Sequence, residues 1–146
     1  MNILFVCTGN TCRSPMAELY FNHLCRSAGI AAHASSCGIA TYSGLPISDN
    51  AYKVMQTFGI NADDFCSTAA DLQVIEKADR IYTMTASHAN ALLRVFPQAR
   101  GKVNTLLPDR DVPDPFGGNF DVYLSTFNSI KKRLEELAFK AKEDTE

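Results

Sequence analysis

The chain has 146 residues, of which 46% are hydrophobic and 21% are charged, a length that suits one domain with a core of its own. Its formal charge of −2, from 14 basic and 16 acidic residues, gives no electrostatic reason to expect binding to nucleic acid or to an anionic membrane. No apolar run approaches the roughly 18 residues of a membrane span, and the N-terminal residues do not resemble a signal peptide, so we expect a cytoplasmic protein.

Strands and helices are predicted to alternate along the first half of the chain. Residues 2–7, NILFVC, form a nearly continuous apolar run, which is typical of a strand buried on both faces of a parallel sheet. Ser14 and Pro15 then begin a predicted helix that ends at Gly29. A second strand is expected over 31–36, and Ser48 is expected to cap a helix that ends at Gly59.

The second half continues the same alternation. A strand is predicted over 80–84, a helix over 86–96 stopped by Pro97, and a strand over 102–107. Residues 119–141 are predicted to form the last helix, because five apolar residues recur three and four positions apart: Tyr123, Phe127, Ile130, Leu134 and Leu137. This order predicts parallel βαβ units in a single α/β domain, residues 1–146.

The cysteines and histidines do not have the spacing of a metal site or a disulfide framework. The number of cysteines is odd, no pair has C-x-x-C spacing, and the histidines lie far apart. Three cysteines are expected to be buried packing residues: Cys25, Cys37 and Cys66. The histidines are expected at the surface or as helix caps: His23, His33 and His88.

The stretch FVCTGNTCRSPMAE, residues 5–18, indicates an anion-binding loop. Parallel sheets bind ligands at the carboxyl ends of their strands, and Cys7 ends the first predicted strand. The turn that follows can direct backbone N–H groups into a cup, and Gly9 accepts conformations that a side chain forbids. The start of the next helix adds unpaired N–H groups and a partial positive charge, so an oxyanion is the expected ligand.

Cys7 and Arg13 have the properties of a phosphoryl-transfer pair. A thiol is more readily ionised at a helix N-terminus near an arginine. A guanidinium can hold two phosphoryl oxygens through parallel hydrogen bonds, and the Ser14 hydroxyl can donate to the thiolate. The alternative is an inert cysteine at the end of a buried strand, since C-x5-R also arises by chance. The preceding strand, the glycine and the helix start favour catalysis.

A general acid is needed to protonate the leaving group, and the stretch RDVPDPFGGNFDVY, residues 110–123, offers Asp114. This stretch follows the fourth predicted strand, which places it on the same edge of a parallel sheet as Cys7. Asp114 lies between two prolines, Phe116 can form a wall of the pocket mouth, and two glycines allow a sharp turn. The alternative is a plain turn before the last helix.

These motifs resemble the low-molecular-weight protein-tyrosine phosphatase family, on FVCTGNTCRSPMAE near the N-terminus and DPFGG ahead of the last helix. The resemblance implies a four-stranded parallel sheet flanked by helices, a three-layer sandwich of the flavodoxin-like kind, with no metal, no cofactor and a phosphocysteine intermediate. It implies that Cys7 is the nucleophile, that Arg13 binds the phosphoryl oxygens, and that Asp114 acts as acid and then as base. The other residues implied at the substrate are Thr8, Gly9, Asn10, Thr11, Cys12, Ser14, Tyr42 and Phe116.

The same resemblance implies supporting roles for three of these positions and one more. Asn10 and Ser36 would hold the loop in shape, and Ser14 would stabilise the thiolate. Cys12 resembles the second loop cysteine of the family, which can form a reversible protective disulfide with Cys7. The implied partners are phosphorylated proteins.

Within the family, the residue at position 11, here threonine, indicates which substrate the enzyme takes. Tyrosine-directed members usually carry an apolar residue there, whereas CTGNTCRSPMAE with DPFGG resembles the bacterial protein-arginine phosphatase branch. A threonine hydroxyl at the wall can accept a hydrogen bond from a guanidinium leaving group. Tyr42 lies where tyrosine-directed relatives place an aromatic that stacks on the substrate ring, so phosphotyrosine remains the alternative; Tyr42 can equally be a surface residue without a substrate role.

Two other interpretations of these motifs assign the chain to different functional classes. The loop also resembles thioredoxin-coupled arsenate reductases, but those need further cysteines after the third strand, and IYTMTASHANALL contains none. A non-catalytic phosphate-binding module is disfavoured by the combination of Cys7, Arg13 and Asp114.

Overall fold

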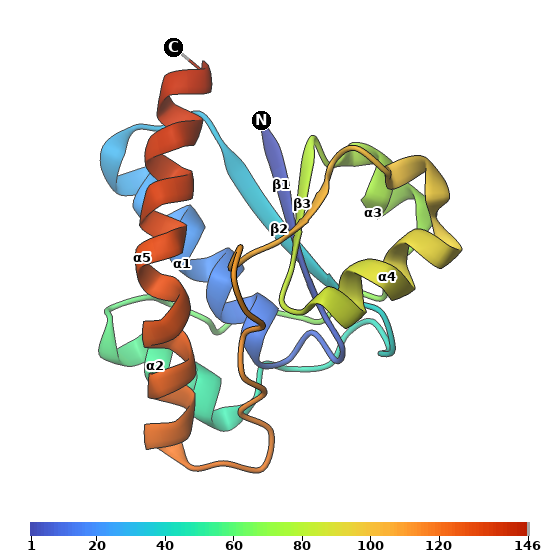
Figure 1. Ribbon diagram of the computed structural model, residues 1–146. Helices are drawn as coiled ribbons and strands as arrows, with labels where there is room; N and C mark the ends of the chain where they lie inside the picture. Colours follow the sequence, from blue (N-terminus) through green and yellow to red (C-terminus); the bar gives the residue numbers. More distant parts are fainter. Residues whose placement is uncertain (146) are drawn as a thin grey trace.

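The computed structural model describes residues 1–145 and has a sheet with helices on both sides (Figure 1). The elements in chain order are β1 (Asn2–Cys7), α1 (Arg13–Ala28), β2 (His33–Gly38), α2 (Asp49–Thr57), α3 (Leu72–Lys77), β3 (Arg80–Thr83), α4 (Ala86–Val95), the 3-10 turn η1 (Pro97–Ala99), β4 (Val103–Thr105) and α5 (Phe120–Thr145). The four strands lie in the order β2-β1-β3-β4, and every adjacent pair is parallel. The predicted α/β class with a four-stranded parallel sheet is therefore confirmed.

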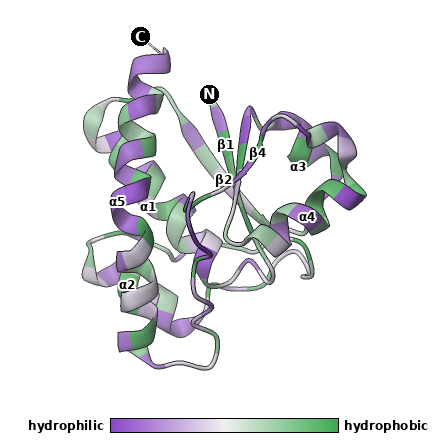
Figure 2. Ribbon diagram, viewed as in Figure 1, coloured by the Kyte–Doolittle hydropathy of each residue, from purple (hydrophilic) through white to green (hydrophobic). Residues whose placement is uncertain are grey.

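The alternation of side chains along β1 divides the core into two layers. Ile3, Phe5 and Cys7 face the cluster formed with α1, α2 and α5, whereas Leu4 and Val6 face the cluster formed with α3 and α4. All five are almost fully buried, because successive strand residues point to opposite faces and both faces are covered. In Figure 2, hydrophobic colour runs along the central strands. Cys7 therefore belongs to the strand that is most deeply enclosed.

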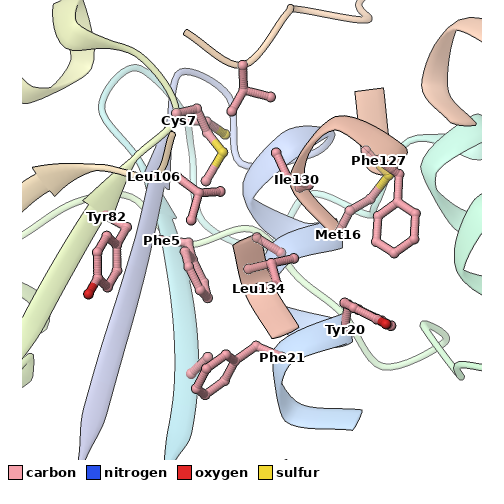
Figure 3. Close-up of a cluster of buried hydrophobic side chains, with 14 of the residues drawn as sticks. Phe5, Cys7, Met16, Tyr20, Phe21, Tyr82, Leu106, Phe127, Ile130 and Leu134 are labelled. Atoms are coloured by element: carbon pink, nitrogen blue, oxygen red, sulfur yellow. The ribbon is translucent and has the colours of Figure 1, made fainter. Parts of the chain in front are cut away.

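The last helix provides a large part of one layer of the core. Its predicted apolar stripe is buried at every position from Tyr123 to Leu137, and α5 packs against both α1 and α2. Figure 3 shows Phe127, Ile130 and Leu134 of α5 facing Met16 and Tyr20 of α1. Each such buried side chain contributes roughly 1.5–3 kcal/mol, so the stripe fixes α1, and with it the loop that precedes α1, against the sheet.

Several predicted boundaries are wrong. β2 starts two residues later than 31–36, and β4 has only three residues of the predicted 102–107. At the end of this strand, the Thr105 hydroxyl donates a hydrogen bond to the Leu107 carbonyl at 3.0 Å. Helix α3 was not predicted, because its six residues are too few for a periodic signal. It is capped by Asp71, whose carboxylate accepts the Val74 N–H at 2.9 Å.

Two predictions about single residues are also wrong. Cys25 and Cys37 are buried, and burial raises the pKa of the Cys37 thiol to about 12, but Cys66 is exposed in the connection between α2 and α3. His88 was expected at the surface or as a helix cap, yet the residue is only 5% exposed. The first turn of α4 lies against the loop after β1, where the His88 ring contacts Thr8.

Among the helices within residues 1–145, none is both long and apolar enough to span a membrane. The same residues hold no group of three or more His, Cys, Asp and Glu side chains arranged to bind a metal ion.

Candidate active site

The loop between β1 and α1, residues 8–12, is held in a shape that most residues disfavour. Asn10 has a φ of 54°, and within residues 1–145 it is the only residue other than glycine with a positive φ. Asparagine tolerates this left-handed conformation better than most side chains do. Asn10 is fully buried, so its amide must find partners inside the protein.

The Asn10 side chain connects the loop to three other segments. Its Nδ2 donates to the Ser14 hydroxyl at 2.8 Å and to the Ser36 hydroxyl at 2.9 Å. Its Oδ1 accepts the backbone N–H of Thr68 at 2.8 Å. The loop is thereby tied to α1, to β2 and to the chain before α3, which explains how an irregular segment keeps one conformation.

Cys7 lies at the floor of this loop and is 3% exposed. Its Sγ is 2.7 Å from the Ser14 hydroxyl and 3.2 Å from the backbone nitrogen of Asn10. Both groups can donate hydrogen bonds to a sulfur that carries negative charge, and the Arg13 guanidinium lines the same pocket.

Arg13 joins the loop to the segment that precedes α5. Its side chain is buried, and one terminal nitrogen donates to the Val112 carbonyl at 3.0 Å. The other terminal nitrogen lies 3.9 Å from Asp114 Oδ2, while Asp114 Oδ1 accepts the Phe116 N–H at 3.1 Å. Arg13 thus holds the segment of residues 112–114 in place, and Asp114 lines the same pocket as Cys7 and Arg13.

A pocket of about 320 Å³ collects nine of the twelve residues that the sequence singled out: Cys7, Thr8, Gly9, Asn10, Thr11, Cys12, Arg13, Asp114 and Phe116. Ser14 and Ser36 lie behind the loop and contact it through the hydrogen bonds of Asn10. Tyr42 is not in this pocket; it is 82% exposed and lines the hollow next to it.

Three residues near the loop were missed by the sequence reasoning. Glu18 accepts the Ser36 hydroxyl at 2.8 Å, and burial raises the pKa of this carboxyl to about 7. Glu18 lies one turn after Ser14 on α1, so this spacing could have indicated that both face the loop.

His88 and Tyr123 reach the loop from α4 and α5. His88 Nε2 is 2.8 Å from the Thr8 hydroxyl, and burial, with the nearby Arg13 charge, lowers the pKa of its ring to about 4. The Tyr123 hydroxyl is 3.2 Å from Cys12 Sγ, and burial raises its pKa. No local pattern could have identified these contacts, because they join residues 80 and 111 positions apart.

A thiol at the base of a buried loop, an arginine at the start of the helix that follows and a carboxylate facing them are the arrangement expected of a cysteine-dependent phosphatase. A family model described as "Low molecular weight phosphotyrosine protein phosphatase" matches residues 2–146. The chain belongs to this family.

Individual relatives cover almost the whole chain. A protein-arginine-phosphatase of Bacillus subtilis is 34% identical, with 99% of each chain covered. The low molecular weight protein-tyrosine-phosphatase PtpB of Staphylococcus epidermidis is 32% identical, with 96% of this chain and 99% of the relative covered. A structure of the C7S mutant of the YwlE arginine phosphatase, with a phosphorylated active site serine, has a TM-score of 0.93 at 34% identity and covers 99% of this chain and 97% of that one.

Proposed function

We propose that residues 1–146 act as one cytoplasmic phosphatase domain that removes phosphoryl groups from phosphoarginine in proteins through a phosphocysteine intermediate on Cys7. The observation that carries this proposal is the meeting of Cys7, Arg13 and Asp114 around one pocket, although more than a hundred residues separate the first from the last. A cytoplasmic site is supported by chemistry that needs a free thiolate, which a reducing compartment preserves.

In the first step, the Cys7 thiolate attacks phosphorus and the bond between phosphorus and the leaving nitrogen breaks. Arg13 and the N–H groups of the loop bind the phosphoryl oxygens, where negative charge is concentrated. Asp114, as the acid, gives its proton to the leaving guanidine nitrogen. The products of this step are the free arginine side chain and a phosphorylated Cys7.

In the second step, Asp114 takes a proton from a water molecule and the resulting hydroxide attacks phosphorus. The bond between sulfur and phosphorus breaks, and inorganic phosphate leaves. The electron pair returns to Cys7 Sγ, which the Ser14 hydroxyl, 2.7 Å away, stabilises by donating a hydrogen bond. The enzyme is regenerated without a redox change.

Phosphoarginine is favoured over phosphotyrosine by the pocket wall and by the relatives. Thr11 lines the pocket and presents a hydroxyl that can accept a hydrogen bond from a guanidinium group. Two protein-arginine-phosphatases, each 34% identical, support the same choice. Phosphotyrosine is the second candidate, since relatives named protein-tyrosine-phosphatase match over almost the same length.

The deciding experiment compares kcat/KM for a phosphoarginine protein and a phosphotyrosine peptide, with wild type and with Thr11→Ile. We expect phosphoarginine to be preferred by wild type, and the substitution to reverse the order, because an isoleucine leaves the guanidinium N–H groups without a partner. A wild-type preference for phosphotyrosine would refute the arginine assignment.

A separate variant tests the nucleophile. Cys7→Ser is expected to abolish turnover while retaining the binding of inorganic phosphate, measured by calorimetry, since Arg13 and the loop remain. Measurable turnover by Cys7→Ser would contradict the assignment of Cys7.

A further inference from the structure

A second hollow adjoins the pocket that contains Cys7. It has a volume of about 550 Å³ and is lined by Gly9, Thr11, Ala40, Thr41, Tyr42 and Leu45. Gly9 and Thr11 also line the first pocket, so the two hollows share one wall. A ligand that enters the first pocket therefore passes the edge of the second.

The lining of this second hollow is largely apolar. Ala40, Leu45 and the ring of Tyr42 supply hydrocarbon surface, Thr11 and Thr41 add methyl groups, and no lining residue carries a charge. Tyr42 is 82% exposed and Leu45 is 40% exposed, so both side chains have apolar surface in contact with water. Removing that surface from water favours an apolar occupant.

The backbone around the second hollow is held in place before any ligand binds. The hydroxyl of Ser67, a residue that is 2% exposed, donates to the Tyr42 carbonyl at 2.6 Å and accepts the Leu45 N–H at 2.9 Å. The Ala40 N–H donates to the Thr8 carbonyl at 3.0 Å. Because segment 40–45 is fastened to the interior and to the loop, binding there costs little ordering of the chain.

The occupant follows from the substrate. When a phosphorylated side chain of a protein reaches Arg13, the polypeptide that carries it runs past the mouth of the pocket. Consecutive Cα atoms lie about 3.8 Å apart, so the nearest neighbours of the phosphorylated residue lie over the surface beside the mouth. The wall shared through Gly9 and Thr11 makes the second hollow the adjoining surface on that side.

We propose that the hollow lined by Ala40, Tyr42 and Leu45 binds an apolar side chain of the substrate protein, close in sequence to the phosphorylated residue. This inference rests on the proposed function, because the first pocket must hold the phosphoryl group. It gives the enzyme a preference among phosphorylated sites that the phosphoryl pocket alone does not supply.

The test is a scan of phosphoarginine peptides. In a Gly- and Ser-rich peptide, each of the three positions on either side of the phosphorylated arginine carries leucine, glycine or glutamate in turn, and kcat/KM is measured for each peptide. At one position, leucine is expected to raise kcat/KM about fivefold over glycine, as partial burial of a leucine side chain predicts. A flat scan, or a preference for glutamate, overturns the inference.

A pair of variants locates the effect. Leu45→Asp is expected to bring the ratio of kcat/KM for the leucine and glycine peptides close to one. Leu72→Asp is the matched control, because Leu72 is 45% exposed, lies outside this hollow, and its substitution is expected to keep the fivefold ratio. An unchanged ratio in Leu45→Asp overturns the location, and the wild-type scan remains decisive if that variant does not fold.

The two proposals fail in different ways. Wild-type turnover of free phosphoarginine and of p-nitrophenyl phosphate is measured in the same series. Loss of all turnover would refute the proposed function, whereas normal turnover with a flat peptide scan would refute only the second binding site.

Discussion

Replacing Asn10 tests the claim that one buried amide holds the loop of residues 8–12 in shape. Asn10→Ala removes the three side-chain hydrogen bonds, to Ser14, Ser36 and the Thr68 N–H, and also places a Cβ-bearing residue without a polar side chain at a φ of 54°. Asn10→Gly removes the same hydrogen bonds but accepts this φ without strain. The two variants therefore separate hydrogen bonding from backbone conformation.

The magnitude follows from these contacts. Each buried hydrogen bond contributes about 1 kcal/mol net, and an alanine forced into the left-handed region costs about 1 kcal/mol more. Asn10→Ala is expected to lower the free energy of unfolding by about 4 kcal/mol, and Asn10→Gly by about 3 kcal/mol. Both are expected to lower kcat at least about tenfold, because Ser14 loses the partner that positions it beside Cys7.

The assay is urea unfolding at pH 7 together with kcat on p-nitrophenyl phosphate. Asn119→Ala is the control, since Asn119 is exposed and its side chain makes a single capping bond, to the Val122 N–H, worth about 1 kcal/mol. The reasoning is refuted if Asn10→Ala is no less stable than the control variant, or if Asn10→Gly is less stable than Asn10→Ala.

Three further predictions concern the surroundings of the loop. A Cβ at Gly38 would lie 2.6 Å from the Thr8 carbonyl oxygen, so Gly38→Ala is expected to displace the loop and to lower kcat/KM at least about tenfold. A wild-type kcat/KM in this variant would contradict the prediction, because it would show that the loop can move aside without loss of activity. The pKa of Glu18 is raised to about 7, so its contribution to stability is complete below pH 4.5 and lost as pH rises through 7; Glu18→Gln should therefore exceed wild type by on the order of 2 kcal/mol in urea unfolding at pH 8.5, and equal stabilities would contradict this. The pKa of His88 is lowered to about 4, so its contribution is complete above pH 6.5 and lost as pH falls toward 4; the melting temperature of His88→Gln should fall less than that of wild type between pH 7 and pH 4.5, and parallel curves would count against a buried neutral ring.

The parts of the fold that the sequence predicts well are those whose signal is local. The stripe from Tyr123 to Leu137 spans four turns, and its period reports burial of one helix face directly. The loop from Cys7 to Arg13 is likewise contiguous, so strand, turn and helix start can be read together. Helix α3 and the end of β4 depend on tertiary contacts made by short segments, and these have no period to detect.

The predicted pocket residues that the structure brings together were those carried by contiguous motifs, whereas the supporting contacts were not visible in the sequence. Histidine as a residue type favours the surface or a helix cap, and nothing in the sequence near His88 names a partner, so its burial and its contact with Thr8 were missed. For Tyr42, the resemblance to the family implied a position at the substrate. Only the folded structure shows that Tyr42 lines a separate hollow beside the pocket of Cys7.

The position of β1 inside the sheet has a consequence for synthesis of the protein on the ribosome. β1 pairs first with β2, which is complete at Gly38, but its other neighbour, β3, begins only at Arg80. At about 5–20 residues per second, the second edge of β1 stays unpaired for roughly 2–8 seconds. During most of that time its side chains Leu4 and Val6 lack the cover of α3, and they lack the cover of α4 throughout.

An open apolar strand edge invites pairing with another chain. Nascent chains that stall before β3 are therefore expected to aggregate or to require a chaperone, although they already contain Cys7 and Arg13. The buried contact between Arg13 and the Val112 carbonyl forms later still. Cys7 is thus synthesised early, but the segment around Val112 that completes its pocket is added only when translation is nearly complete.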